Sequence, residues 1–177
     1  AHIIYYILFI IIYRLAEGFV MKVVPLFLHD PVSQGGLGLS NEQIGTYYGT
    51  FGAAAFVVGS ILGGNVIARF GLKRVLFVLA LIFNLPFLVY TFLAIYQPSS
   101  LWLIGGGIVI EYFGYGFGFV GLTMFMMHQI APGKNQMSHY AIASGIMNLS
   151  VMVTGMSSGK LTTLLGYEGF FLFVLIF

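Results

Sequence analysis

Residues 3–28 read IIYYILFIIIYRLAEGFVMKVVPLFL, an apolar run that three charged side chains interrupt: Arg14, Glu17 and Lys22. The run is longer than the roughly 20 apolar residues that a helix needs to cross a bilayer. A charge at the centre of a lipid-exposed helix costs roughly 2.5–3.5 kcal/mol, so such residues usually face a bundle interior or a water-filled cavity. The stretch therefore predicts a transmembrane helix with one polar face, in a protein that moves something polar across a membrane.

The composition of the whole chain agrees with this interpretation. Hydrophobic residues make up 59% of the 177 residues and charged residues only 7%, against roughly 25% charged residues in a soluble domain. We therefore expect a polytopic membrane protein that contacts lipid. The formal charge of +2 is too small to indicate a nucleic-acid partner, and the absence of cysteine excludes disulfides and thiol catalysis.

Turn signals divide the chain into six predicted spans and hence one all-α, six-helix membrane bundle. The spans are approximately residues 3–28, 44–68, 75–95, 101–130, 140–165 and 169 to the last residue. Ser40 and Gln43 form a predicted capping box at the start of the second span. The chain begins without Met and its last apolar run has only about ten residues, half of a bilayer-spanning helix. We therefore expect a fragment with sequence missing at both ends.

Glycines spaced four residues apart predict close packing between the helices, because small residues let helix backbones approach. The pairs are Gly45/Gly49, Gly59/Gly63, Gly114/Gly118 and Gly155/Gly159.

The charges in the loops predict the orientation. One set of loops holds Arg69, Lys73, Arg74 and Lys134, and the other set holds Asp30, Glu42 and Glu168. Because cytoplasmic loops carry an excess of Lys and Arg, loops 68–74 and 131–139 are predicted to be cytoplasmic. Lys160, near the outer end of the fifth span, is the residue that disagrees with this assignment.

The loop between the second and third spans reads GNVIARFGLKR, residues 64–74. It resembles the Gly-x-x-x-Asp-Arg-x-Gly-Arg-Lys signature of the major facilitator superfamily at Gly64, Arg69, Gly71 and Lys73. Ala68 stands in place of the acid, so the resemblance does not extend to the salt-bridge latch attributed to that acid. These four residues are the predicted conformational loop motif.

Further stretches are similar to the second half of the AmpG-type muropeptide permeases. They are YRLAEGF at 13–19, PLFL at 25–28, LGLS at 37–40, QIG at 43–45, EYFGYGFG at 111–118 and YAIAS at 140–144. The resemblance implies that residues 1–177 are spans seven to twelve of a twelve-helix carrier, with the N-terminal half as an absent partner. It also implies proton-driven import of anhydro-muropeptides through the bacterial inner membrane, for peptidoglycan recycling.

A six-helix half of this superfamily consists of two inverted three-helix repeats, so its first and fourth spans occupy equivalent, cavity-lining positions. The first span carries Arg14, Glu17 and Lys22, and the fourth carries Glu111. The second and third spans carry no charge at depth. The charged residues within the membrane-spanning segments thus lie on the spans that line the cavity in this fold.

Two alternatives remain for the first-span charges. Arg14 and Lys22 lie on one helical face and could bind the carboxylates of an anionic glycopeptide, with Glu17 as their counter-ion. Alternatively, Arg14 and Glu17, three residues apart, form a structural ion pair.

Glu111 is the first candidate for proton coupling and Glu17 the second, because a carboxyl group removed from water favours its neutral form. The alternative role for Glu111 is a hydrogen bond that ties two helices together. Tyr115, in the same aromatic stretch, could stack on a sugar or simply pack. Lys160 could line the outer mouth of the cavity or anchor to lipid headgroups.

Other functional classes remain open. The carrier could transport another solute, such as a sugar, a peptide, a drug or a coenzyme A thioester. An intramembrane enzyme would need polar residues clustered near one membrane face, and a receptor or scaffold would not need Arg14 or Glu111 at depth. We expect no enzyme activity, no cofactor and no metal, because the four histidines are scattered and no Ser-His-Asp set, P-loop or dinucleotide fingerprint is found.

Overall fold

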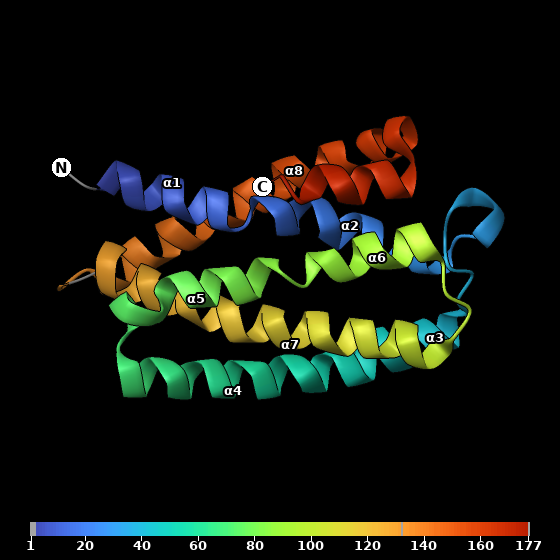
Figure 1. The fold of residues 1–177 in the computed structure, drawn as a ribbon. Helices are drawn as coiled ribbons and strands as arrows, with labels where there is room; N and C mark the ends of the chain where they lie inside the picture. The colour runs from blue at the N-terminus through green and yellow to red at the C-terminus, as the bar shows by residue number, and fades with distance from the viewer. Residues whose placement is uncertain (1–2, 132, 177) are drawn as a thin grey trace.

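A computed structural model describes residues 3–131 and 133–176, which are helical throughout apart from turns and short loops (Figure 1). Pro132, part of the predicted 131–139 loop, lies outside the described residues. The α-helices are α1 (Ile3–Tyr13), α2 (Leu15–His29), α3 (Asn41–Ile44), α4 (Gly52–Phe70), α5 (Leu72–Asn84), α6 (Phe87–Tyr96), α7 (Leu101–Phe125) and α8 (Gln136–Val174). A 3-10 turn, η1 (Val32–Gln34), and two π-helical segments, η2 (Gly45–Phe51) and η3 (Met126–Ile130), complete the order.

Within the described residues, five helical segments are long and apolar enough to cross a membrane. They are Ile3–His29, Asn41–Phe70, Leu72–Tyr96, Leu101–Ile130 and Gln136–Val174. The predicted all-α membrane bundle is confirmed, and the first four predicted spans each lie on one of these segments.

The predicted fifth and sixth spans both fall in α8. The chain turns back at Gly166, whose φ of 69° lies in the left-handed region that favours glycine, and the second part runs alongside α2 (Figure 1). The described helix after this turn ends at Val174, well short of the roughly 20 residues of a full span. The count of six spans is therefore not confirmed.

Two of the spans are interrupted, one at Arg14 and one at a proline. Arg14 separates α1 from α2 with φ −104° and ψ 5°, outside the ordinary helical values. Pro86 separates α5 from α6, because proline has no N–H for the helical hydrogen bond. The first interruption places Arg14 and Glu17 at the middle of the bundle.

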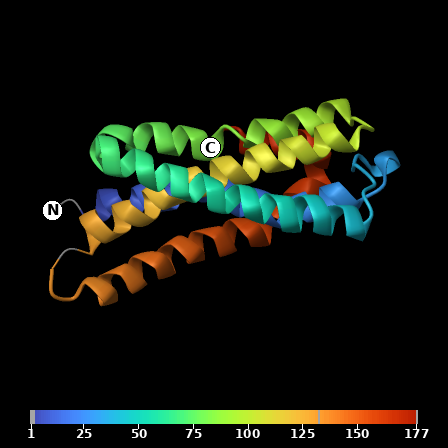
Figure 2. The same ribbon diagram turned by 90° about the horizontal axis from the view of Figure 1, so that it is seen from below.

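Glycines bring α7 against its neighbours, and Figure 2 shows α4 and α7 running side by side. A Cβ at Gly63 would lie 2.5 Å from the Phe117 carbonyl oxygen, and one at Gly118 would lie 2.6 Å from the Leu79 carbonyl oxygen. The predicted close packing is confirmed for Gly59/Gly63 on α4 and Gly114/Gly118 on α7. It is wrong for Gly45/Gly49, where a Cβ would meet nothing within 4 Å, and for Gly159 of the fourth pair.

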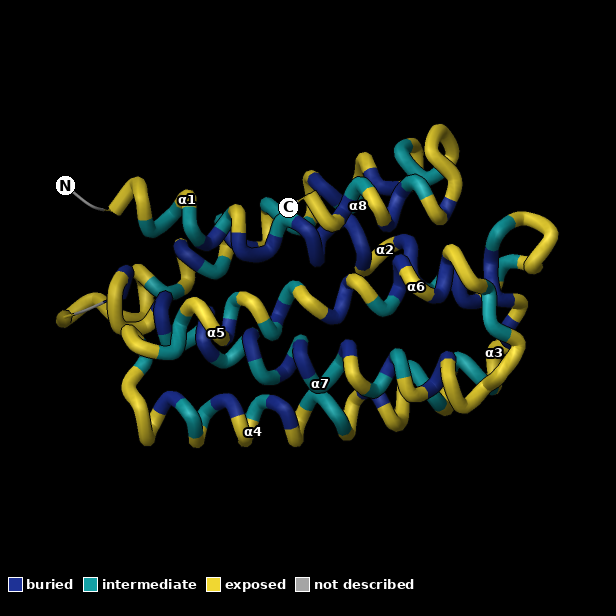
Figure 3. Tube along the Cα trace, viewed as in Figure 1, coloured by how far each residue is buried: buried dark blue, intermediate teal, exposed yellow. Residues whose placement is uncertain are grey.

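The buried residues lie on the helix faces that point into the bundle, while the outward faces are exposed and apolar (Figure 3). The α4–α5 turn and the α7–α8 connection lie at one end of the bundle, and the α2–α3 and α6–α7 loops at the other (Figure 1). The basic and acidic loops therefore lie at opposite ends, as predicted. The Ser40 capping box at the start of α3 is also confirmed, with Gln43 N donating to Ser40 Oγ at 3.2 Å.

Candidate functional site: a buried cavity with two carboxyl groups

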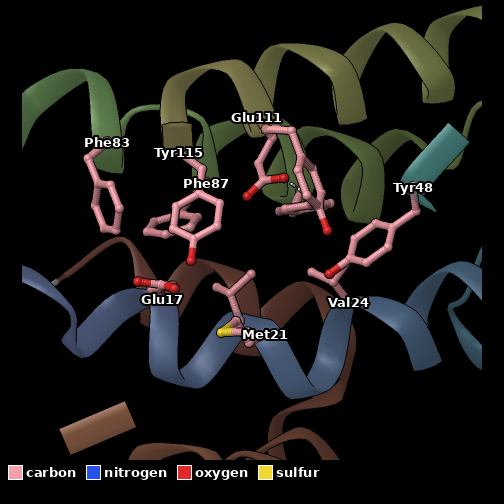
Figure 4. Close-up of a pocket in the computed structure, with 11 residues that line it drawn as sticks. Glu17, Met21, Val24, Tyr48, Phe83, Phe87, Glu111 and Tyr115 are labelled. Carbon is pink, nitrogen blue, oxygen red and sulfur yellow. Dashed lines mark hydrogen bonds between the residues drawn. The ribbon is translucent and has the colours of Figure 1, made fainter. Parts of the chain in front are cut away.

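A small enclosed cavity near the middle of the bundle is lined by both of the carboxyl groups predicted for proton coupling. Glu17 reaches it from α2 and Glu111 from α7 (Figure 4). Tyrosines supply most of the remaining polar atoms: Tyr48, Tyr90, Tyr112 and Tyr115. The cavity measures about 40 Å³, room for a few water molecules and far below the roughly 300 Å³ of a small ligand pocket.

Glu111 is 8% exposed, and its Oε2 accepts a hydrogen bond of 3.0 Å from the hydroxyl of Tyr90 on α6. Tyr90 is itself 1% exposed and its ring stacks on Phe171, which lies on α8 after the turn at Gly166. Within the described part of the chain, Glu111 makes no ion pair. This carboxyl group is therefore held by a neutral partner, and the contact ties α6 to α7.

Glu17 has a different environment. Its carboxylate accepts two hydrogen bonds from the Arg14 guanidinium, one from Nε at 2.5 Å and one from the NH2 group. Arg14 also lies over the ring of Phe119, 5.2 Å from its centroid, and donates to the sulfur of Met147 at 3.6 Å. Both charged side chains are buried, so the predicted pairing of Arg14 with Glu17 is confirmed.

The two carboxyl groups share one aromatic wall. The Tyr115 hydroxyl points toward Glu17, and Glu111 lies one helical turn earlier on the same helix (Figure 4). Tyr48 packs edge-on against Tyr112, with ring centroids 4.9 Å apart. Tyr115 thus packs between aromatic rings and carboxyl groups, in a space too small for a sugar.

Lys22 does not join this cavity. It is exposed and lines a separate groove between α2 and α8, where a Cβ at Gly155 would lie 3.2 Å from its Cγ. Gly18, on the same helical face, packs on the backbone of Val151 in α8. The structure therefore turns the predicted cationic face toward α8 and separates Arg14 from Lys22. Lys160 is exposed on α8 and lies outside both the cavity and the groove.

The predicted conformational loop motif forms the tight turn between α4 and α5. Gly71 has φ 80° and ψ 138°, a conformation that favours glycine. Arg69 and Lys73 are exposed on either side of it. Gly64 lies nearly two turns into α4 from this end and faces open space.

Two tyrosines of the cavity were not among the predicted site residues: Tyr90, which donates to Glu111, and Tyr48, which lines the cavity. Both lie in apolar runs where a tyrosine fits as an ordinary packing residue. The polar ends of such residues usually find partners when they are buried, but the sequence does not show which partner.

A bundle of apolar helices that buries an ion pair and a further carboxyl group around an inner cavity is typical of membrane transporters. The chain belongs to the Major Facilitator Superfamily, whose sequence model matches residues 6–177. It is a multi-pass membrane protein, and its resemblance to this superfamily is confirmed.

The curated relatives are permeases of the AmpG type. The chain is 25% identical to Putative transporter AmpG 1 of Rickettsia felis, over 98% of the chain and 38% of the relative. It is 26% identical to Putative transporter AmpG 4 of Rickettsia conorii, over 96% and 39%. It is 25% identical to the Anhydromuropeptide permease of Escherichia coli K12, over 94% and 33%. The chain thus spans one third to two fifths of the length of these relatives, and no solved structure matches it significantly.

Proposed function

We propose that this chain is the C-terminal half of a proton-coupled carrier that imports anionic glycopeptides of the anhydro-muropeptide type. The supporting observation is that Glu17 and Glu111 enter one buried cavity from the two spans that the superfamily fold makes equivalent. The relative named as an anhydromuropeptide permease supports the substrate class. An N-terminal half would supply the opposite wall of the transport path.

Glu111 is the proposed proton carrier. Its partner, the Tyr90 hydroxyl, can donate to the ionised carboxylate and can accept from the protonated acid. Both protonation states therefore keep a hydrogen bond at little reorganisation cost. Glu17 is held in its ionised form by two charge-assisted hydrogen bonds from Arg14, so we rank it second.

The proposed location is the bacterial inner membrane, with loops 68–74 and 131–139 in the cytoplasm. The basic residues of these loops lie at one end of the bundle, and Asp30 and Glu42 at the other. This separation follows the positive-inside rule.

The test uses the full-length carrier in proteoliposomes, with labelled anhydro-muropeptide as the probe. Glu111→Gln keeps the shape and a hydrogen-bonding group at this position but cannot release a proton. We expect gradient-driven accumulation to be abolished while exchange of labelled for unlabelled substrate partly persists. Unchanged accumulation would show that Glu111 is not part of the coupling mechanism. If the wild-type protein transports another solute but no anhydro-muropeptide, the proposed substrate class is wrong.

A further inference from the structure

An apolar hollow opens on the surface of the bundle near its basic end and shares no residue with the carboxyl cavity. It measures about 290 Å³ and lies where the first turns of α1, the end of η3 and the beginning of α8 meet. Five isoleucines form most of its lining, and we call it the isoleucine hollow: Ile3, Ile7, Ile130, Ile142 and Ile146.

His139 gives the isoleucine hollow a polar edge. It lines the hollow from the first turn of α8, next to the α7–α8 connection. Ile142 and Ile146 follow on the same helical face, farther from the end of the bundle. The lining therefore changes from polar to apolar, and a ligand that matches it has a polar group at one end and an apolar chain at the other.

The positive charge around this edge has no counter-ion in the described part of the chain. Lys134, in the α7–α8 connection, makes no ion pair there, and the imidazole of His139 has no hydrogen-bond partner there. The five acidic residues of the chain lie in the middle of the bundle or at its other end (Figure 1): Glu17, Asp30, Glu42, Glu111 and Glu168. The polar group of a matching ligand is therefore an anion.

From this arrangement we propose that the isoleucine hollow binds an anionic phospholipid. One acyl chain fills the hollow, and Lys134 and His139 hold the phosphate. Basic pockets between transmembrane helices at the cytoplasmic side bind anionic lipid headgroups in the same way. An apolar protein helix would cover the isoleucines but would leave both basic side chains without a counter-ion.

The site concerns the lipid around the carrier and not the transported solute, so it goes beyond the proposed function and does not depend on it. It is tested without any transport measurement.

Protection of a cysteine tests the isoleucine hollow directly, because residues 1–177 contain no cysteine. Ile142 lines the hollow and is 63% exposed, so Ile142→Cys places a reactive thiol in it. Leu149→Cys is the matched control, since Leu149 lies on the same helix, is 54% exposed and is outside the hollow. Both variants are made in the full-length carrier, in a background without other reactive cysteines, and are treated with N-phenylmaleimide in a non-ionic detergent.

The probes are dioleoyl phosphatidylglycerol, dioleoyl phosphatidylcholine and free glycerol 3-phosphate. We expect phosphatidylglycerol to slow labelling at Ile142→Cys but not at Leu149→Cys. Phosphatidylcholine, which has the same chains and no net charge, should need at least about fivefold higher concentrations, as expected for the contribution of one basic residue near the membrane surface. Glycerol 3-phosphate, which has no acyl chain, should give no protection.

Charge variants locate the headgroup. Lys134→Gln with His139→Gln should remove the difference between the two lipids while protection by the shared acyl chains remains. Arg74→Gln, exposed at the same end but in the first turn of α5, is the control and should leave the difference unchanged.

Equal protection by the two lipids, or none by either, would overturn the proposal. Protection by glycerol 3-phosphate would show a site for a free anion instead of a lipid. An Ile142→Cys thiol that does not react even without added lipid would show that another part of the full-length carrier covers the hollow, which also contradicts the proposal.

Discussion

The ion pair between Arg14 and Glu17 has the geometry of a structural pair. Both side chains are buried, and their charge-assisted hydrogen bonds are directed at each other. Removing one partner of a buried pair leaves an uncompensated charge, which costs about 3–5 kcal/mol, whereas replacing both by apolar residues is often nearly neutral.

We therefore expect Arg14→Met to destabilise the protein strongly and Arg14→Met with Glu17→Met to recover most of that loss. Unfolding in mixed detergent micelles measures both variants. In the full-length carrier, Arg14→Ala should weaken binding of an anionic substrate far more than binding of a neutral analogue if Arg14 also contacts substrate. Equal losses for the two ligands would favour the purely structural pair.

Tyr90 gives a second prediction for a single residue. Tyr90→Phe removes the donor to Glu111 and keeps the ring that stacks on Phe171. Since a hydrogen bond to a charged group contributes about 1.5–3 kcal/mol, we expect gradient-driven uptake to fall about tenfold or more, with a smaller effect on exchange. Tyr96→Phe, on the exposed end of α6, is the control and should leave both activities unchanged. If Tyr90→Phe lowers uptake and exchange by the same factor, Tyr90 contributes to folding and not to proton coupling.

The site could be predicted from the sequence only in part. Glu17 and Glu111 were found because a carboxylate in an apolar run is costly and rarely accidental. Tyr90 and Tyr48 were missed because a tyrosine in such a run carries no comparable cost. The separation of Lys22 from Arg14 depends on how α2 is rotated against α8, and helical spacing alone does not contain this information.

Among the elements, α7 depends on glycines for its close contacts. A Cβ at Gly118 would lie 2.5 Å from the Phe83 Cβ, and overpacking of this kind costs about 1–3 kcal/mol. At Gly106, on the same helix, a Cβ would meet nothing within 4 Å, and alanine stabilises a helix interior by roughly 0.5–1 kcal/mol relative to glycine.

Gly118→Ala should therefore lower the melting temperature in detergent, and Gly106→Ala should raise it or leave it unchanged. The two substitutions are of the same type and lie on the same helix, so the difference between their melting temperatures measures the effect of the contact with α5. Equal melting temperatures would contradict the close approach of α5 and α7.

The spans themselves were predicted well, because length, hydropathy and Pro or Gly breaks are local properties of the sequence. Four predicted spans coincide with helical segments of the structure. The turn at Gly166 falls in the predicted break between residues 165 and 169. The interruption at Arg14 was not predicted, because it depends on contacts with other helices. At this point the helix breaks beside the ion pair and the ring of Phe119.

At the scale of the whole molecule, the charges at the ends of the bundle decide which way it lies in the membrane. Ser99, in the loop between α6 and α7, and Gln43, near the start of span two, line one surface hollow at the acidic end. Lys134, between α7 and α8, lies at the basic end (Figure 1). α7 and η3 join the two ends as one segment, Leu101–Ile130, which is long enough to cross a bilayer.

The reactivity of single-cysteine variants in intact cells measures this orientation. We expect Ser99→Cys to react with a membrane-impermeant maleimide added outside, and Lys134→Cys to react only after the membrane is opened, because positively charged loops stay in the cytoplasm. Asn41→Cys, at the acidic end and exposed, should behave as Ser99→Cys does. If the two ends react in the opposite order, the proposed orientation is wrong although the fold stands. If Ser99→Cys and Lys134→Cys react from the same side, the segment between them does not cross the membrane, and the path proposed through the bundle has no basis.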